Sequence, residues 1–249
     1  MKIMTLNLNF FERKHGPWPI RRELIAQAIQ QHGPDIVAFQ AVQKDPERED
    51  GKDQAAQLAD RLPEFKHVAF VAAAQHGQGR QDGSAFLSRI PFERIEHRVL
   101  RLGIESPHQV EDPARRIIMF ARLASPALSL FNSHFSWVYR QAASNLEEGL
   151  TYMRQIDGPA LLVGDLNNTP DSDLMQRLIA EGWTDVWAYL RPRDPGYTFE
   201  SHAPDKRIDY IWARGDLGPS LKAIDLVKEQ SNAQGARLSD HLGLVVTLT

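Results

Sequence analysis

Ala160-Leu-Leu-Val-Gly-Asp-Leu-Asn-Asn-Thr-Pro170 is the stretch of the sequence that most constrains the fold. Its apolar run stops at Gly164, and an acid, two amides and a proline follow. A short apolar run bounded by turn residues predicts a buried strand, and loops at the end of such a strand often carry function. If the backbone stays extended past Gly164, Asp165 and Asn167 point to the same side. That face would pair a proton-accepting carboxylate with an amide, although for this segment taken alone an ordinary polar turn is the better explanation.

The composition is that of an ordinary globular chain. Of its 249 residues, 42% are hydrophobic and 24% charged. No linker, repeat or low-complexity tract divides the chain, so one domain over residues 1–249 is expected. The absence of cysteine excludes disulfides, thiolate metal sites and a cysteine nucleophile. No run is apolar enough to span a bilayer and the first residues lack the pattern of a signal peptide, so we expect a cytoplasmic protein without a membrane span.

The net charge of -3 at pH 7 bears on the partners of the protein. A protein that binds duplex DNA usually carries a basic surplus, because phosphate neutralisation supplies most non-specific affinity. The balance disfavours a nucleic-acid substrate without excluding it, since local basic groups exist at Arg115 with Arg116 and at Lys206 with Arg207. We expect the protein to be a monomer.

Apolar periodicity and turn signals predict an α/β protein rich in strands. The expected helices cover residues 20–32, 54–62, 140–155 and 172–180. The expected strands cover residues 2–8, 36–39, 67–72, 85–87, 117–123, 128–131, 160–163, 207–213, 221–227 and 242–248. The first helix should bury one stripe made of Ile20, Leu24, Ile25, Ala28 and Ile29. Residues 76–83 contain three glycines but no following Gly-Lys-Ser/Thr, so they predict a mobile surface loop and not a phosphate-binding loop.

Polar residues follow several of the expected strands. They are Asn7, His134, Asp165 with Asn167, and Asp240 with His241. Asp209 lies inside the apolar strand at 208–212, where an unpaired buried charge is costly, so it needs a partner, for which His241 is a candidate. Each residue alone has an ordinary explanation, because Asp240 fits a turn, His134 a core histidine and Asp209 a strand edge. Their joint occurrence is what indicates a functional site.

Short motifs that include these residues run from the first expected strand to the last. They are Thr5-Leu-Asn7, Asp35-Ile-Val-Ala-Phe-Gln40, Gly83-Ser-Ala-Phe-Leu-Ser-Arg89, Asn132-Ser-His134, Gly164-Asp-Leu-Asn167, Gly182-Trp-Thr-Asp185, Arg207-Ile-Asp-Tyr210 and Ser239-Asp-His241. In this order the set resembles the endonuclease/exonuclease/phosphatase superfamily, which includes DNase I-like nucleases, sphingomyelinases, inositol-polyphosphate phosphatases and deadenylases. The resemblance implies an α/β, DNase I-like fold: a four-layered sandwich of two packed mixed β-sheets flanked by helices. The active site is then expected where the sheets meet at one end.

The resemblance also implies a metal-dependent phosphoester hydrolase with a role for each position. Asp165 would orient and deprotonate the attacking water. Asn167 and His134 would hold the phosphate oxygens, and His241, oriented by Asp209, would stabilise the charge that develops in the transition state. Such chemistry depends mainly on positioning and on neutralising spread-out negative charge.

The expected metal site contains one departure from the family pattern. Asn7 and Asp240 belong to the region that holds Mg²⁺ or Mn²⁺ in the family, and oxygen ligands suit Mg²⁺. Where the family places its principal metal-binding glutamate, this sequence has Ala41. A methyl group cannot bind a cation, so the metal should be held weakly. Either an enzyme carries an inactivating residue, or the chain is a naturally degenerate pseudoenzyme that binds a phosphate-bearing ligand or a protein partner without turnover. The intact remaining motifs favour the inactivated enzyme.

The substrate is expected to be a phosphate ester, and the sequence narrows it little further. His134 stands where abasic-site endonucleases of this superfamily commonly carry tyrosine, which places the chain nearer the DNase I, sphingomyelinase and phosphatase branches. Trp137 and Tyr139 either wall the substrate site or pack as ordinary aromatics. Arg115 and Arg116 either contact a substrate phosphate or form a solvated strand end. A nucleic acid, a lipid headgroup, a nucleotide and a sugar phosphate all remain open.

Overall fold

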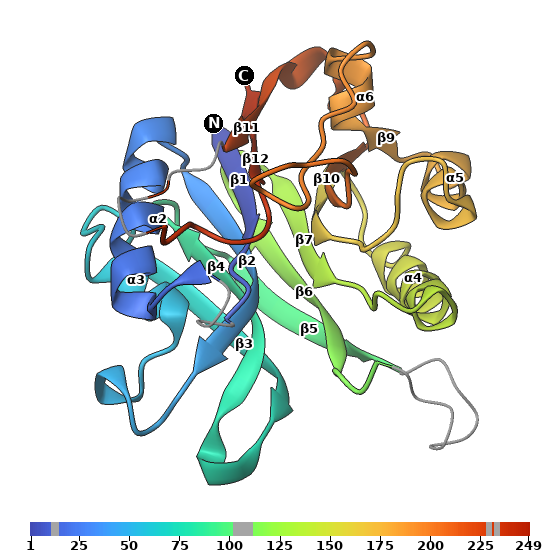
Figure 1. Ribbon diagram of the computed structural model, residues 1–249. Helices are drawn as coiled ribbons and strands as arrows, with labels where there is room; N and C mark the ends of the chain where they lie inside the picture. Colours follow the sequence, from blue (N-terminus) through green and yellow to red (C-terminus); the bar gives the residue numbers. More distant parts are fainter. Residues whose placement is uncertain (11–14, 102–111, 228–230, 232–234) are drawn as a thin grey trace.

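The fold is a sandwich of two β-sheets with helices on the outside. The computed structural model describes residues 1–10, 15–101, 112–227, 231 and 235–249, and within these ranges the strands form two six-stranded sheets. Figure 1 shows the sheets packed face to face, with α2 and α3 on one side and α4 and α5 on the other. The four-layered DNase I-like sandwich expected from the motif order is therefore confirmed.

The first sheet carries the amino-terminal half of the chain and both ends. Its strands, in spatial order, are β11 (Leu221–Val227), β12 (Gly243–Leu248), β1 (Lys2–Asn7), β2 (Ile36–Lys44), β4 (Gln81–Ser88) and β3 (His67–Gln75). The strands β1 and β2 are parallel, and the other neighbours are antiparallel. This order places the ends of β1 and β2 side by side.

The second sheet has the same mixed character. Its strands, in spatial order, are β5 (Arg94–Leu100), β6 (Arg116–Leu123), β7 (Leu128–His134), β8 (Ala160–Asp165), β10 (Asp209–Arg214) and β9 (Thr184–Asp185). The strands β7 and β8 are parallel, and the others pair antiparallel. Consequently β8, which contains the apolar run at 160–163, is a central strand.

Helices cover the outer face of each sheet. On the first sheet these are α2 (Trp18–His32) and α3 (Gln54–Ala59); on the second they are α4 (Tyr139–Met153) and α5 (Asp173–Ala180). The short helix α6 (Val186–Leu190) packs near β10 and β11. Local capping sets several helix starts: the Asp53 carboxylate accepts from two backbone N–H groups of α3, and Ser172 caps α5.

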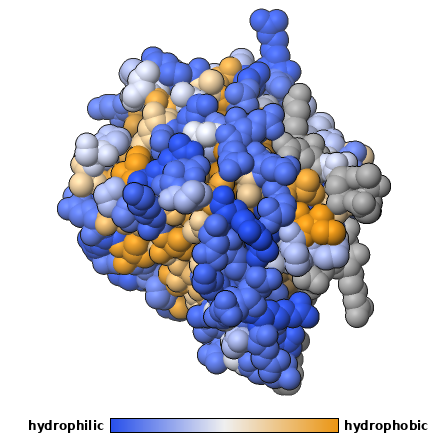
Figure 2. All heavy atoms as spheres, turned by 90° about the vertical axis from the view of Figure 1, so that its left-hand side faces the viewer, coloured by the Kyte–Doolittle hydropathy of each residue, from blue (hydrophilic) through white to orange (hydrophobic). Residues whose placement is uncertain are grey.

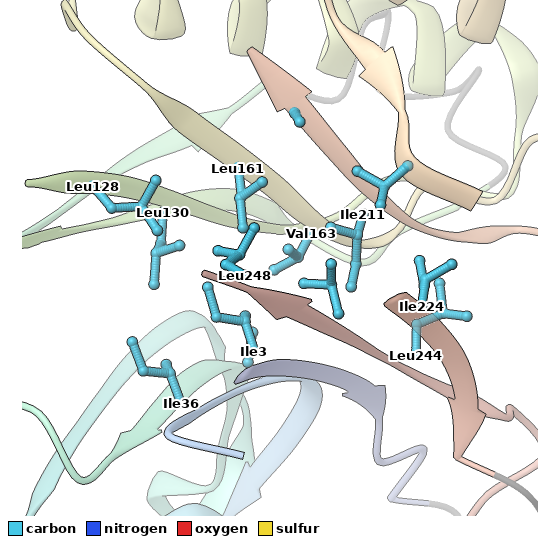
Figure 3. Packing of buried hydrophobic residues seen from close by; sticks show 14 of the residues in the cluster. Ile3, Ile36, Leu128, Leu130, Leu161, Val163, Ile211, Ile224, Leu244 and Leu248 are labelled. Atoms are coloured by element: carbon cyan, nitrogen blue, oxygen red, sulfur yellow. The ribbon is translucent and has the colours of Figure 1, made fainter. Parts of the chain in front are cut away.

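The central strands bury side chains on both faces. In β1, Ile3 lies between the sheets whereas Met4 packs beneath the α2 layer, and in β8, Leu161 lies between the sheets whereas Leu162 faces the α4 layer. A strand covered on both sides needs a continuous apolar run, not an alternating one. Figure 3 shows the cluster between the sheets, which includes Ile3, Ile36, Leu128, Leu130, Leu161, Val163, Ile211, Ile224, Leu244 and Leu248.

Several sequence-based expectations about elements were wrong. The edge strand β5 and the helix α6 were not predicted, because the sequence of β5, Arg-Ile-Glu-His-Arg-Val-Leu, is charged and largely exposed. The strand β4 begins at Gln81, so the loop expected over 76–83 is shorter. The α2 stripe is also different: Ile20 is 37% exposed, whereas Arg21 is buried and donates to the backbone carbonyls of Leu8 and Leu238.

The surface agrees with the composition. Figure 2 shows the face that carries α2 and α3, which is mainly hydrophilic with separate apolar patches. Among the described residues, no helix combines the length and the apolar character needed to cross a membrane.

Candidate active site

Neighbouring strand ends bring the polar residues of the motifs together. In the second sheet the backbone register pairs His134 with Asp165 and Asp165 with Asp209, so the ends of β7, β8 and β10 place these three residues in one row. From the first sheet, Asn7 ends β1 and His241 lies just before β12. The Asn7 Nδ2 atom donates to the Asp165 Oδ2 atom at 2.8 Å, which joins the two sheets at this end.

These side chains surround a cavity of about 320 Å³. Nine of the residues that the sequence predicts for the site line this cavity: Asn7, Ala41, Arg115, Arg116, His134, Trp137, Asp165, Asn167 and His241. The remaining two, Asp209 and Asp240, are buried, and each carboxylate lies within 4 Å of a ring nitrogen of His241. The volume suits a small ligand or one end of a larger one.

An acid–base pair is formed by Asp209 and His241. The Nδ1 atom of His241 lies 2.9 Å from the Asp209 Oδ2 atom, so the expected pairing is present, and the ring of Phe199 packs with its centroid 4.9 Å from that of the imidazole. Burial alone would lower the pKa of His241, but the carboxylates of Asp209 and Asp165 outweigh burial and raise that pKa to about 10. The imidazole is therefore doubly protonated at neutral pH.

Asp165 occupies the centre of the cluster. Its Oδ1 atom accepts the backbone N–H of Asn167 at 2.9 Å, and its Oδ2 atom lies 3.4 Å from His134 Nε2 and 3.7 Å from His241 Nε2. Burial raises the pKa of Asp165 to about 7, the charge of Asp209 adds to this, and the charge of His241 opposes it. A carboxylate with a pKa near neutrality is suited to accept a proton from water.

His134 differs from His241 in its charge. Burial and the nearby positive charges of Arg116 and His241 hold the pKa of His134 well below its usual range. The ring is therefore neutral at pH 7 and retains one N–H for donation. Two histidines that face the same carboxylate are thus held in opposite protonation states.

The turn after β8 places Asn167 differently from the sequence-based expectation. The strand ends at Asp165, and Asn167 has a φ of 52°, so the backbone does not stay extended as far as Asn167. Asn167 Nδ2 donates to the Phe135 carbonyl at 2.9 Å, and the next residue is fixed by Tyr210, whose hydroxyl donates to the Asn168 carbonyl at 2.7 Å. Both Asp165 and Asn167 still line the cavity, because the turn and not an extended strand brings them there.

The two adjacent arginines have different environments. Arg115 is exposed, whereas Arg116 is buried and its Nη2 atom donates to the Asp112 Oδ2 atom at 2.7 Å. A solvated strand end therefore describes Arg115 but not Arg116. Trp137 is 61% exposed although it lines the cavity, so packing does not account for this large apolar side chain.

The residues at the expected metal position are hydrogen-bonded to one another through Asn9. Asn7 Oδ1 accepts the backbone N–H of Asn9 at 2.9 Å, and Asn9 Nδ2 donates to Asp240 Oδ2 at 2.6 Å. The other carboxylate oxygen of Asp240 accepts from the Ser239 hydroxyl at 3.2 Å. Asn7 and Asp240 together offer one amide and one carboxylate, so a Mg²⁺ ion here would take most of its oxygen ligands from water or substrate.

Ala41 lies in a β-bulge beside this position. The register between β2 and β4 shifts between Phe39 and Val42, and Ala41 has a φ of 50°. The strand pairing of β1 with β2 sets Asn7 opposite Gln40, so residue 41 follows at the same edge of the sheet. A methyl group here contributes no ligand atom to the cavity that it lines.

A second group of potential metal ligands overlaps the acid–base pair. Within the described residues, Asp165, Asp209 and His241 offer ligand atoms that all lie within 4.8 Å of one another. Metal ligation requires a deprotonated imidazole nitrogen. Because the pKa of His241 is raised to about 10, we interpret these three residues as an acid–base cluster.

Sequence reasoning gave no role to the amides that join the sheets. Gln40 Nε2 donates to Asn132 Oδ1 at 2.7 Å and to Thr5 Oγ1 at 3.0 Å, and Asn132 Nδ2 donates to the carbonyls of Phe39 and Ala85. These buried polar side chains bridge the two sheets directly behind the cavity. Their signal in the sequence is an amide inside or directly after an apolar strand.

Comparisons with known proteins found a family model and solved structures that match the chain. The model of the Endonuclease/Exonuclease/phosphatase family matches residues 4–241. No curated protein matches the chain.

Solved structures share the fold at low sequence identity. A mannosyl-6-phosphatase from Bacteroides thetaiotaomicron VPI-5482 is similar with a TM-score of 0.76 and 18% identity, covering 100% of this chain and 99% of the other. A family protein from Leptotrichia buccalis C-1013-b has a TM-score of 0.74 and 18% identity over 100% and 99% of the two chains. A 3′ phosphatase from Neisseria bound to a product DNA hairpin has a TM-score of 0.68 and 19% identity, again over 100% and 99%.

Proposed function

Because the chain belongs to the endonuclease/exonuclease/phosphatase family, whose members are metal-dependent phosphoester hydrolases, we propose that it is a phosphoester hydrolase whose turnover is limited by Ala41. One observation carries this proposal. The Asp165 carboxylate, with a pKa raised to about 7, faces the His241–Asp209 pair, His134 and Asn7 on the wall of one cavity.

The proton-transfer step is assigned to Asp165. Asp165 takes a proton from a water molecule, whose oxygen then forms a bond to phosphorus while the bond from phosphorus to the leaving oxygen breaks and the leaving oxygen keeps the electron pair. A carboxylate whose pKa lies near the working pH is an efficient general base. The hydrogen bonds from Asn7 Nδ2 and the Asn167 backbone N–H hold the carboxylate in one orientation.

The negative charge on the phosphate oxygens in the transition state would be stabilised by fixed donors. His241 is doubly protonated and its Nε2 atom lies 3.7 Å from Asp165 Oδ2, so the ring presents an N–H beside the reacting water. Neutral His134 has one N–H for a non-bridging phosphate oxygen. Preorganised donors of this kind are typically worth several kcal/mol of barrier, because they need no reorganisation during the reaction.

The weak part of the proposed site is its cation position. A bound Mg²⁺ or Mn²⁺ would neutralise phosphate charge and orient the ester. Asn7 and Asp240 would offer such an ion one amide and one carboxylate, each with an oxygen that already accepts a hydrogen bond from Asn9, and Ala41 would offer no ligand. At about 1.4 kcal/mol per tenfold in rate, loss of several kcal/mol slows hydrolysis by orders of magnitude.

The test of the proposed function is Ala41→Glu. We expect this variant to hydrolyse bis-p-nitrophenyl phosphate or p-nitrophenyl phosphate with Mg²⁺ or Mn²⁺ about 10³-fold faster than the unchanged chain, a gain of about 4 kcal/mol. Calorimetry should show a matching gain in Mg²⁺ affinity. Ala73→Glu is the matched control, because Ala73 lines the same cavity but lies on β3, away from Asn7 and Asp240.

A second candidate function is binding without turnover. The hydrogen bonds of Asn9 to Asn7 and Asp240 favour it, because they satisfy the expected metal ligands with protein groups. The panel for this test contains phosphomonoesters and phosphodiesters. The pseudoenzyme is supported if the unchanged chain and Ala41→Glu both show negligible hydrolysis across the panel and Ala41→Glu gains no metal affinity. The same panel separates phosphatase from nuclease activity, because it contains both phosphomonoesters and phosphodiesters.

A further inference from the structure

Arg116 is a buried cation on the wall of the cavity. Its exposed fraction is 8%, and its Nη2 atom donates to Asp112 Oδ2 at 2.7 Å. The Nε–H group makes no hydrogen bond with any described residue, although it is buried. Arg116 lines the cavity together with His134, and its charge is strong enough there to lower the pKa of His134. A buried guanidinium that lines a cavity and has more N–H groups than the described residues use is suited to a ligand with acceptor oxygens.

Asp112 is itself held from several directions. Its Oδ2 atom also accepts from the Ser136 hydroxyl at 2.7 Å, and its Oδ1 atom accepts the backbone N–H of Ala114 at 3.0 Å. Its backbone is fixed too, since its N–H donates to the Gln141 Oε1 atom at 3.1 Å and its carbonyl accepts from Gln141 Nε2 at 2.7 Å. The carboxylate thus has one position, set by the start of α4 and by the loop before β6.

An ion pair of this kind fixes a guanidinium plane. Arginine in water samples many rotamers, and ordering it on binding costs free energy that reduces affinity. A carboxylate that already holds one edge of the guanidinium removes much of this cost and leaves the remaining N–H groups for a second anion, which arginine can bind bidentately. The negative charge of Asp112 also partly cancels the positive charge of Arg116, and this cancellation weakens anion binding. These two effects have opposite signs, and an experiment can separate them.

We propose that Arg116 binds the substrate phosphate in this cavity and that Asp112 is a positioning residue that holds Arg116 for this purpose. The chain should therefore bind a phosphate dianion without a divalent cation. The proposal rests on the proposed function for its choice of ligand. The positive charge of Arg116 is present whatever residue occupies position 41, so phosphate binding by Arg116 can be tested independently of metal binding.

The test is binding of inorganic phosphate to the unchanged chain, measured by titration calorimetry with EDTA present. Arg116→Met should weaken phosphate binding by about 10- to 100-fold, since a hydrogen bond to a charged group is lost with its charge. Asp112→Ala should weaken it about tenfold even though a negative charge is removed beside the cavity. Arg154→Met is the matched control, because it removes the same charge from an exposed surface pair with Glu181 and should leave binding unchanged.

The direction of the Asp112→Ala effect decides the role of Asp112. If Asp112 acts only by its charge, its removal tightens phosphate binding, and if the pair is only structural, binding stays the same; either result overturns the positioning role. Unchanged binding by Arg116→Met overturns the phosphate site itself. Should Asp112→Ala fail to fold by circular dichroism, Ser136→Ala loosens the same carboxylate and should weaken binding about two- to threefold.

A kinetic arm distinguishes this inference from the proposed function. In the Ala41→Glu background, Asp112→Ala should raise KM about tenfold and lower kcat by a smaller factor. Asp112→Asn keeps an acceptor for Arg116, so its KM should lie close to that of the Ala41→Glu parent. Loss of phosphate binding on Arg116→Met supports the site even if Ala41→Glu shows no turnover. Turnover by Ala41→Glu with unchanged phosphate binding and KM for Arg116→Met rejects the inference and leaves the proposed function intact.

Discussion

The two sides of the cavity differ in how completely they are built. On the acid–base side, Asp165 of the second sheet faces a neutral His134, the backbone amide of Asn167 and a protonated His241 that reaches across from the first sheet. On the side of the first sheet, Asn7 and Asp240 are tied to one another through Asn9, and position 41 offers a methyl group. The acid–base side therefore holds charges that need a reaction or a ligand, whereas the metal side has satisfied its charges within the protein.

This difference shows which costs the fold bears. A buried aspartate with a raised pKa destabilises the folded state at neutral pH, because the unfolded chain ionises it freely. In a chain that no longer uses proton transfer, we would expect Asp165 to be replaced by a residue that does not destabilise the folded state. The Asp240 side carries no such cost, because the charge of His241 together with the hydrogen bond from Asn9 outweighs burial and lowers the pKa of Asp240. The contrast favours an enzyme that lacks one ligand over a binding protein that has lost the whole site.

The largest effect that would sharpen the comparison is expected from Asp165→Asn in the Ala41→Glu background. Removing the proton acceptor should lower kcat about 10³-fold, within the range typical of general bases, while Mg²⁺ affinity changes little. The measurement is phosphoester hydrolysis together with Mg²⁺ calorimetry for both proteins. Activity within tenfold of the parent would mean that another group takes the proton and that the acid–base side has been assigned wrongly.

A smaller effect is expected from Asp209→Asn in the same background. The amide keeps a hydrogen bond to His241 but removes the carboxylate that raises its pKa, so the doubly protonated ring is lost at lower pH. We expect kcat to fall about 10²-fold at pH 7 and the alkaline limb of the kcat profile to move to lower pH. An unchanged alkaline limb would contradict the role of the pair.

The smallest effect concerns the stability contributed by neutral His134. Because its folded-state pKa is lowered, this histidine binds fewer protons when folded than when unfolded, and stability falls as pH drops below about 6.5. At about 1.4 kcal/mol per pH unit, the loss between pH 6.5 and pH 5 reaches up to about 2 kcal/mol. His134→Gln should remove this loss. Thermal unfolding at pH 5 and pH 7 checks it, and an equal decrease in Tm for both proteins would show that His134 is protonated in the fold.

Much of the fold followed from patterns that depend on local chemistry. The continuous apolar run at 160–163 identified β8 as a strand covered on both faces, and Gly33, with a φ of 60°, ended α2 as expected. The charged sequence of β5 hid an edge strand, because exposed strands need little apolar surface. Boundaries also moved where hydrogen bonds between distant segments decide them, as in the extension of β2 to Lys44.

The residues of the site were easier to predict than their environment. Asp209 inside an apolar strand required a partner, and a histidine near the end of the chain satisfied it. The roles of Asn9 and Asp112 were not predicted, because each depends on a contact between segments that are distant in the sequence or on a turn that no motif marks. The position of Asn167 was predicted from an extended strand and is in fact set by a turn.

The bulge at Ala41 sets the backbone that a glutamate at this position would have to adopt. A non-glycine residue at a φ of 50° costs roughly 1 kcal/mol. Glycine would adopt the same backbone without strain. Ala41 already places a β-carbon on this bulge, so a glutamate at the same position would bear the same backbone cost and no additional one. Under the proposed function, Ala41→Glu would therefore need no rebuilding of the strand around it.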